Sequence, residues 1–331
     1  MNCEMEHKIF EVDASTFEAT SLEVYQFQYK ENPVYRAFSD LVHRNPGTVK
    51  QLSDIPFMPI GFFKSQTIQC GSFNPQAVFE SSGTTQTGNS KHEVKELAIY
   101  QESFRAAFTQ FYGKVDSYCV LGLLPSYLER KGSSLVYMVD DMIRESQHPQ
   151  SGTYLYDHAK LAEVLQSLEA AQQPTLLIGV TFALLDFAAQ YPMPLQHTIV
   201  METGGMKGRR EEWTREQVHQ ELQQAFSISN VHSEYGMTEL LSQAYSQGNG
   251  LFSCPPWMRV LLREEEDPFN ILQTVGARGV VNVIDLANLY SCSFIATEDA
   301  GKLNANNQFE VLGRVDYSDI RGCSLMSPGI Q

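Results

Sequence analysis

The chain has 331 residues, of which 43% are hydrophobic and 19% are charged, and this balance is typical of a globular protein and too apolar for a disordered one. It carries 24 Lys and Arg residues against 39 Asp and Glu residues, so its formal net charge is -15, which disfavours nucleic acid as a partner. An anionic substrate would need a local pocket of backbone N–H groups, a few basic side chains and a divalent metal.

The six cysteines are scattered, without a CxxC pair or a Cys/His spacing that suits zinc, so we expect neither a disulfide scaffold nor a zinc site. The first 15 residues are polar, and no run of about 18 apolar residues occurs that would cross a bilayer. We therefore expect a cytoplasmic protein without a membrane span.

Hydrophobic periodicity predicts an α/β chain. Residues 15–44 have apolar side chains at near-helical spacing with an interruption at Asn32-Pro33, which predicts two helices. Short β-like runs then alternate with helical patterns, which is typical of parallel βαβ units. The predicted strands are residues 77–80, 118–123, 175–180, 197–201 and 227–231. The predicted helices between them are residues 100–111, 157–172, 181–190 and 211–226, with Asp157 as the N-cap of the second.

The pattern changes near residue 256. Helical periodicity fades, and β-like runs at residues 258–262, 280–286 and 309–312 are separated by Gly and acidic turns. We therefore predict two parts, an α/β core over residues 1–255 and a β-rich subdomain over residues 256–331.

The first segment that suggests chemistry is residues 79–91, with the sequence FESSGTTQTGNSK. It places six hydroxyl side chains and two glycines at the end of an apolar β-like run. Small side chains and free backbone N–H groups suit a phosphate cradle. A polar, flexible turn would give the same composition. The segment is not the P-loop of nucleotide-binding ATPases, because the Lys-Ser/Thr pair required after the second glycine is missing.

The second segment is residues 232–239, HSEYGMTE, which follows a predicted strand end, where open α/β sheets bind ligands. Tyr235 offers a ring for stacking on a base, Thr238 a hydroxyl for a phosphate, and Glu239 a carboxylate for a metal. A solvated loop in which Thr238 and Glu239 cap a helix would explain the same residues. There are two further segments, residues 297–301 (TEDAG) and 313–316 (GRVD). Taken alone, each predicts an acidic turn between strands.

In this order, the four segments resemble the core motifs of the adenylate-forming superfamily, which includes acyl-CoA synthetases, peptide-synthetase adenylation domains and firefly luciferase. Residues 80–91, 131–135, 203–207 and 321–325 look most similar to the acyl-protein synthetase component of bacterial luminescence systems. The resemblance covers about residues 15–326. It implies a large N-terminal core with mixed and parallel sheets flanked by helices, a β-rich C-terminal subdomain, and no mobile C-terminal lid domain.

The resemblance also implies the roles of individual residues. Contacts to the ATP phosphates would come from Ser81, Ser82, Gly83, Thr84, Thr85 and Lys91. Contacts to the base and ribose would come from Gly204, Gly205, Tyr235, Gly236, Asp299 and Arg314. Thr238 would meet the α-phosphate and Glu239 would hold Mg2+. The catalytic residues would be Lys91, Thr238 and Cys323.

The sequence departs from the superfamily pattern at three points. Glu298 replaces the glycine of the TGD motif, and Tyr317 replaces the second aspartate of the GRxDD motif. The larger relatives also continue into a subdomain whose lysine assists adenylation, and no residue of this chain can be assigned that role. Either a local Arg or Lys replaces it, or a partner completes the site.

The implied function is ATP-dependent, AMP-forming activation of a carboxylic acid, with a fatty acid favoured, followed by acyl transfer to a protein thiol. Cys323 follows Arg321-Gly322, and a fixed positive charge favours the reactive thiolate. A small half-buried thiol is the alternative interpretation of Cys323.

Two alternatives remain for the function: an AMP-forming acyl-CoA ligase and a non-catalytic protein of degenerate adenylation fold. The expected partners are ATP, a small carboxylate, and either an acyl-accepting protein such as a reductase or carrier, or CoA.

Overall fold

The computed structural model describes residues 2–81, 88–125, 128–204, 213–272 and 274–315. Its helices are α1 (Asn2–Lys8), α2 (Phe17–Glu31), α3 (Pro33–Leu41), α4 (Phe62–Ser65), α5 (Leu97–Tyr112), α6 (Ser134–Ser146), α7 (His158–Ala170), α8 (Thr181–Gln190) and α9 (Arg215–Phe226). Short 3-10 turns span Leu52–Asp54, Val115–Ser117, Leu286–Asn288 and Ala305–Asn307.

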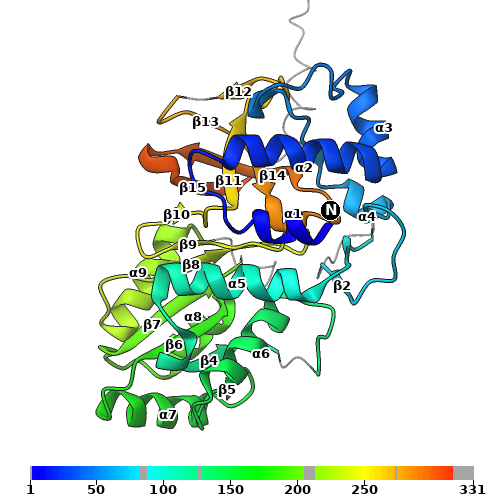
Figure 1. The fold of residues 1–331 in the computed structure, drawn as a ribbon. Coiled ribbons are helices and arrows are strands. Elements are labelled where there is room, and N and C mark those ends of the chain that lie inside the picture. Colours follow the sequence, from blue (N-terminus) through cyan, green and yellow to red (C-terminus); the bar gives the residue numbers. More distant parts are fainter. Residues whose placement is uncertain (1, 82–87, 126–127, 205–212, 273, 316–331) are drawn as a thin grey trace, which may run out of the picture.

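The strands alternate with these helices in the first two thirds of the chain and follow one another in the last third (Figure 1). They are β1 (Met58–Pro59), β2 (Ala77–Glu80), β3 (Lys91–Val94), β4 (Cys119–Leu123), β5 (Gly152–Thr153), β6 (Thr175–Val180), β7 (Thr198–Thr203), β8 (His232–Tyr235), β9 (Ala244–Ser246), β10 (Leu251–Ser253), β11 (Met258–Arg263), β12 (Ile271–Leu272), β13 (Arg278–Asp285), β14 (Phe294–Leu303) and β15 (Phe309–Arg314).

Within the described residues, one mixed sheet of 13 strands has the order β12-β11-β13-β14-β15-β10-β9-β8-β7-β6-β4-β5, with β1 paired to β14. The strands β5, β4, β6, β7 and β8 are parallel neighbours. From β8 through β9 and β10 to β12, neighbouring strands are antiparallel. This mixed α/β architecture, with a β-rich C-terminal part, confirms the predicted fold class.

The central parallel strands β4 (CVLGL) and β6 (TLLIGV) are apolar along most of their length, which suits strands with helices on both faces. Leu121 of β4 and Leu177 of β6 pack with the buried residues of α7, α8 and α9 on one face. Val120 and Leu176, their neighbours in sequence, point to the other face and join the larger core with α5 and α6. The parallel half is therefore a three-layer sandwich.

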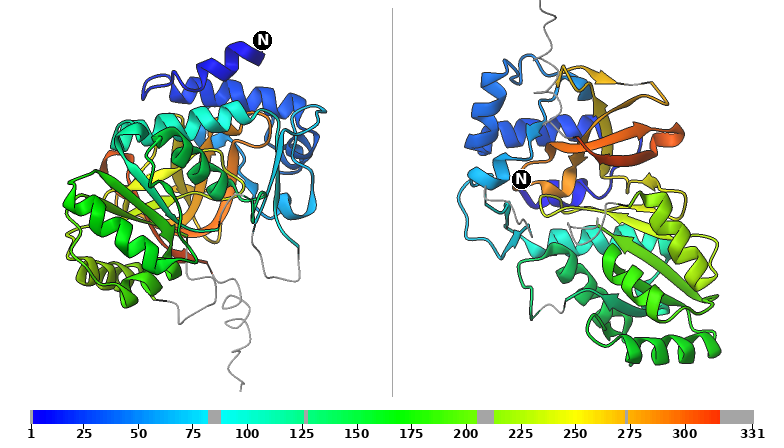
Figure 2. Two further views of the ribbon diagram at one scale, coloured as in Figure 1. Left: turned by 90° about the horizontal axis from the view of Figure 1, so that it is seen from below. Right: turned by 180° about the vertical axis from the view of Figure 1, so that it is seen from behind.

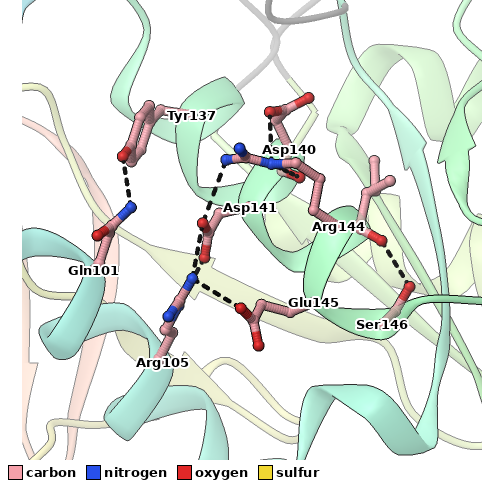
Figure 3. A network of polar contacts seen from close by, with 9 residues as sticks. Gln101, Arg105, Tyr137, Asp140, Asp141, Arg144, Glu145 and Ser146 are labelled. Carbon is pink, nitrogen blue, oxygen red and sulfur yellow. Dashed lines mark hydrogen bonds and ion pairs between the residues drawn. The ribbon is translucent and has the colours of Figure 1, made fainter.

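Ion pairs join α5 to α6 at the edge of this layer (Figure 3). Arg105 donates to the Asp141 carboxylate at 2.8 Å and lies 3.0 Å from Glu145. Gln101, one turn earlier on α5, donates to the Tyr137 hydroxyl at 2.8 Å. The Asp141 side chain is almost fully buried, so its charge requires the bidentate arginine.

The N-terminal helices lie against the C-terminal strands, blue beside orange in Figures 1 and 2. The buried Gln28 amide of α2 donates to the carbonyls of Asn288 and Leu289 at 3.0 Å each and accepts from the Ser293 backbone N–H at 2.9 Å. Asn32 donates to the Ser291 carbonyl. The first and last parts of the chain therefore build one packed unit, and the boundary predicted at residue 255 stays a prediction.

Most predicted elements occur at the expected places, including the break between α2 and α3, where Asn32 accepts from the Tyr35 N–H as N-cap. Asp157 caps α7 by accepting from the Lys160 N–H. The strand predicted at residues 227–231 is wrong, because Ser227 takes a left-handed conformation that ends α9 and the strand begins only at His232. Helix α6 was not among the predicted helices. Among the described residues, no helix is both long and apolar enough to cross a bilayer.

Candidate functional site

The site begins at one edge of the parallel strands. Gly204 directly follows β7, and Tyr235 is the last residue of β8. These strands pair in parallel with Thr203 opposite Glu234, so Gly204 and Tyr235 lie at the same, carboxyl edge of the sheet. Ligands of open α/β sheets bind at this edge. The sheet therefore brings together two of the sequence segments singled out above.

A hydrogen bond connects Tyr235 to the third segment. The Tyr235 hydroxyl donates to Oδ2 of Asp299 at 2.8 Å, and the other carboxylate oxygen of Asp299 lies 3.9 Å from Nε of Arg314. Asp299 and Arg314 are direct partners across β14 and β15. Burial raises the pKa of Asp299, while the Tyr235 hydrogen bond and the Arg314 charge oppose that rise. The tyrosine ring packs edge-on against Phe252 and Phe309.

The two acidic turns predicted from the sequence are strands instead. Asp299 lies inside β14, and Arg314 ends β15. The register between them shifts at Ala300 and Gly301, which is a bulge next to Asp299. A bulge re-aims the side chains beside it, so charged residues in a strand can face a site here. The cross-strand pairing of Asp299 with Arg314 was not predicted.

Strands β2 and β3 form the hairpin that carries the predicted phosphate loop. Glu80 and Lys91 are opposite one another, and Nζ of Lys91 lies 3.5 Å from the Glu80 carboxylate. The Ser81 N–H donates to the Ser90 carbonyl, and the Ser81 hydroxyl accepts from the Ser90 N–H. These two bonds close the base of the loop. The Lys91 side chain is 58% exposed, so a phosphate can compete with Glu80 for its charge.

The hairpin is fixed to the Tyr235 segment by a buried histidine. Nδ1 of His92 lies 3.0 Å from the carbonyl oxygen of Thr238, and Nε2 lies 2.8 Å from the Ser291 hydroxyl. A carbonyl only accepts, so Nδ1 carries the proton and Nε2 accepts from Ser291. Burial lowers the pKa of His92 to about 4, which keeps the ring neutral. Sequence reasoning missed His92, and the alternation of buried residues along β3 is the only signal for it.

Glu239 lies at the same junction. Its side chain is buried, and burial raises its pKa, while the Ser90 hydroxyl beside it and the charges of Arg314 and Lys64 favour the ionised form. Residues 236–243 form no helix, so Thr238 and Glu239 do not cap one. The charge of Arg314 therefore favours the ionised form of both Asp299 and Glu239.

No group of three or more His, Cys, Asp or Glu side chains arranged to hold a metal occurs among the described residues. Mg2+ does not require such a group, because proteins often bind it through one or two carboxylates together with substrate phosphates. Glu239 fits that pattern, because it is a single buried carboxylate next to the phosphate hairpin.

Two glycines shape this edge of the sheet. Gly204 has φ +68°, and a Cβ built there would meet no atom within 4 Å, so the space beside it is open. Its carbonyl accepts from the Thr181 hydroxyl at 2.6 Å, which fixes the turn. At Gly236, a Cβ would lie 2.4 Å from Oε1 of Glu234, so a side chain here would have to displace the end of the Glu234 side chain.

Several predicted residues lie outside the described residues. These are Ser82, Gly83, Thr84, Thr85, Gly205 and Cys323. Their assignments stay predictions, as do the ligand contacts assigned to Ser81, Lys91, Gly204, Tyr235, Gly236, Thr238, Glu239, Asp299 and Arg314.

No protein-family model matches the sequence, and no curated protein matches it. Solved structures do match. ATP-bound MatB from Rhodopseudomonas palustris is 16% identical with a TM-score of 0.55, covering 77% of this chain and 53% of that one. A 2-hydroxyisobutyryl-CoA ligase in complex with 2-HIB-AMP is 13% identical with a TM-score of 0.64, covering 92% and 69%. The same ligase in an open conformation with 2-HIB-AMP and CoA is 11% identical with a TM-score of 0.62, covering 94% and 77%.

The chain spans about half the length of the MatB structure it matches. At these identities the likeness concerns the fold and not the activity. The fold implied by the sequence motifs is nevertheless the fold that these comparisons find. This chain has the adenylate-forming fold that it shares with these ligases.

Proposed function

We propose that this protein activates a carboxylic acid with ATP, releasing pyrophosphate and forming an acyl-adenylate, and then transfers the acyl group to a thiol. The observation that carries the proposal is the connected set of Tyr235, Asp299, Arg314 and Glu239 at the carboxyl edge of the sheet, next to the β2–β3 hairpin. Three sequence motifs that are far apart in the chain meet there.

Each part of this set suits one part of a nucleotide. The Tyr235 ring is rigid and half-buried, so it can stack on a base. Asp299 is held by the Tyr235 hydroxyl through one oxygen and can accept from ribose hydroxyls. The hairpin base presents Lys91 and the Ser81 hydroxyl to phosphates, and Gly204 leaves open space where a base can lie. These groups would compensate the negative charge of the phosphates locally, in a chain whose net charge is -15.

Mg2+ would be held by Glu239, and it would neutralise charge on the phosphates. The reaction is an in-line displacement in which a carboxylate oxygen attacks the α-phosphorus and the bond to pyrophosphate breaks. The protein forms no covalent bond in this step, so positioning and electrostatics supply the rate. Thr238 would contact the α-phosphate, and Lys91 would contact the leaving phosphates. A thiolate then attacks the acyl carbon and AMP leaves.

A protein thiol remains our first choice of acceptor, with Cys323 as the candidate within this chain. CoA is the second candidate, and one observation favours it: a solved structure of the same fold contains both 2-HIB-AMP and CoA. A fatty acid remains the proposed acyl substrate. We propose residues 123–128 and 136–139 as candidates for its slot. Leu123, Leu124 and residues 136–139 are buried in the core, Leu128 is 81% exposed, and residues 126 and 127 lie outside the described residues.

Carboxylate-dependent exchange of pyrophosphate into ATP tests the proposal directly. We expect exchange with Mg2+ and one class of carboxylic acid, and no exchange without the acid. A protein that binds ATP but never exchanges would be a nucleotide-binding scaffold. The acceptor is then identified with labelled acid in two parallel reactions, one with CoA and one without. Hydroxylamine-sensitive label on the parent protein but not on Cys323→Ser supports the protein thiol, whereas acyl-CoA without protein label supports the ligase.

A further inference from the structure

A pocket on the β-rich side of the molecule adjoins the candidate nucleotide site but is lined by other residues. Its volume is about 450 Å3, within the range of small-molecule sites. It lies between the segment that joins α3 to α4 and the strands β11, β12 and β14. Tyr235, Gly236, Thr238, Glu239, Asp299 and Arg314 do not line it.

The walls of this pocket are mainly apolar. Phe38, Phe57, Ile55 and Ile60 line one side, and Ile271 and Phe269 line the other. The Phe269 side chain is 44% exposed, which is unusual for a large aromatic residue. An organic ligand with an apolar body would cover this ring and fill the space.

The charged residues of the pocket are not equivalent. Arg44 lies 3.9 Å from Asp54, so these two charges largely offset one another. Arg263 is buried and donates to the carbonyls of Val281 and Thr297, which makes it part of the wall.

Glu265 and Glu298 are different, because both are exposed at the pocket. Neither carboxylate makes an ion pair or side-chain hydrogen bond with any other part of the described chain. With Arg263 counted, the two arginines and three carboxylates of the pocket leave a formal net charge of -1, on a molecule that is itself acidic.

We propose that this pocket binds a small organic cation, an ammonium group carried on an aryl or alkyl body. The apolar walls remove the body from water, while the carboxylates of Glu265 and Glu298 attract the ammonium group. The pocket is also lined by Phe38, Phe57 and Phe269, and a cation over an aromatic ring gains further attraction. An anion with the same body would meet repulsion from both glutamates, so neither the carboxylate substrate nor ATP fits this pocket.

The pocket borders the candidate nucleotide site through one strand. Thr297 lines the pocket, and its hydroxyl accepts from the Asp299 N–H at 3.1 Å and lies beside the Tyr235 phenol. A ligand in the pocket therefore contacts the residue that positions both Tyr235 and Asp299.

Three probes with one body test the charge preference: 4-phenylbutylammonium, 4-phenylbutanol and 4-phenylbutyrate. Calorimetric titration of each into the full chain at pH 7, without ATP or a carboxylic acid substrate, gives the three affinities. We expect the ammonium compound to bind several-fold more tightly than the alcohol, and the carboxylate more weakly than both. Equal affinities, the reverse order, or no binding of any probe would overturn the proposal.

Variants locate the binding to this pocket. Gly61 lines it with an ordinary φ of -60°, and a Cβ there would meet no atom within 4 Å. Gly61→Leu should therefore fill the pocket and leave the melting temperature close to that of the parent. The affinity for the ammonium probe should fall at least tenfold. If this variant has the melting temperature of the parent and binds the ammonium probe with the same affinity as the parent, the binding site is elsewhere and the proposal fails.

The double variant Glu265→Gln with Glu298→Gln should reduce the preference for the ammonium over the alcohol several-fold and leave the affinity of the alcohol unchanged. Glu266→Gln is the matched control, because Glu266 is equally exposed and does not line the pocket. A preference that survives the double variant would contradict the role of the two carboxylates. Because no nucleotide is present, these results are independent of whether the protein forms an acyl-adenylate.

Discussion

The phenolic oxygen of Tyr235 lies 2.8 Å from Oδ2 of Asp299, although 64 residues separate them in sequence. Tyr235 ends a parallel strand, and Asp299 lies in an antiparallel strand. The bond therefore joins the parallel and antiparallel halves of the sheet. It also sets the spacing between a ring and a carboxylate, which is the spacing that a nucleoside would have to match.

Replacing Asp299 should weaken nucleotide binding without unfolding the protein. Asp299→Ala removes an acceptor that could take charge-assisted hydrogen bonds from ribose, each worth roughly 1.5 to 3 kcal/mol. We expect the Kd for ATP to rise at least tenfold, measured by calorimetry with the melting temperature as a check on folding. Tyr235→Phe is the control, because it keeps the ring and removes only the hydrogen bond to Asp299, so its effect should be smaller. An unchanged Kd in Asp299→Ala would refute the ribose assignment.

Glu239→Gln should separate nucleotide binding from metal-dependent chemistry. The amide is nearly isosteric with the carboxylate but does not neutralise a cation. We expect the Kd for ATP without Mg2+ to stay within about twofold of the parent value. The rate of pyrophosphate exchange should fall by at least a hundredfold and recover in part at high Mg2+. Full exchange at ordinary Mg2+ would show that Glu239 does not hold the metal.

His92→Phe tests whether the buried histidine positions the site. Phenylalanine keeps most of the ring volume and its packing against Phe63, but it leaves the Thr238 carbonyl and the Ser291 hydroxyl without their partner. We expect a loss of stability on the order of 1 to 3 kcal/mol and a fall in exchange rate with little change in the KM for ATP. Denaturant unfolding and exchange kinetics measure the two effects. A variant as active and as stable as the parent would exclude this role.

The acid response provides a second measurement on His92. In the folded state, burial lowers the pKa of His92 to about 4 from 6.5. Between these pH values the unfolded chain therefore binds more protons than the folded one. His92 therefore makes the protein less stable as pH falls from 6.5 to 4. This part of the acid sensitivity should be absent from His92→Phe.

Glu234 should have the opposite effect on stability. Burial raises its pKa to about 7 from 4.5, so the folded protein holds a proton there that the unfolded chain has lost. Stability should fall as pH rises from about 4.5 to about 7 and stay reduced above that. In Glu234→Gln this loss should be smaller by up to roughly 3 kcal/mol, measured by denaturant unfolding at pH 5 and pH 8. Glu221→Gln, an exposed position on α9, is the control and should leave the pH dependence unchanged.

The sequence predicts much of the fold because apolar periodicity is local information. Strand β6 and helix α8 have the predicted bounds, and Asn32 and Asp157 cap the expected helices. The strand after α9 was misplaced because the left-handed Ser227 ends the helix, and its sequence carries no glycine to indicate this. Local patterns say nothing about cross-strand register, so the pairing of Asp299 with Arg314 and the contact of His92 with Thr238 were not predictable.

The hydrogen bonds of Gln28 and Asn32 to residues 288–293 have a consequence for how the protein folds. These partners are about 260 positions apart, and β1 likewise pairs with β14. During synthesis the buried faces of the N-terminal helices stay exposed until the segment around residues 288–296 has been made. Contacts of such long sequence separation slow folding, because loop closure must precede them. The strand that carries Asp299 also pairs with β1, so the candidate nucleotide site should form late, together with these long-range contacts.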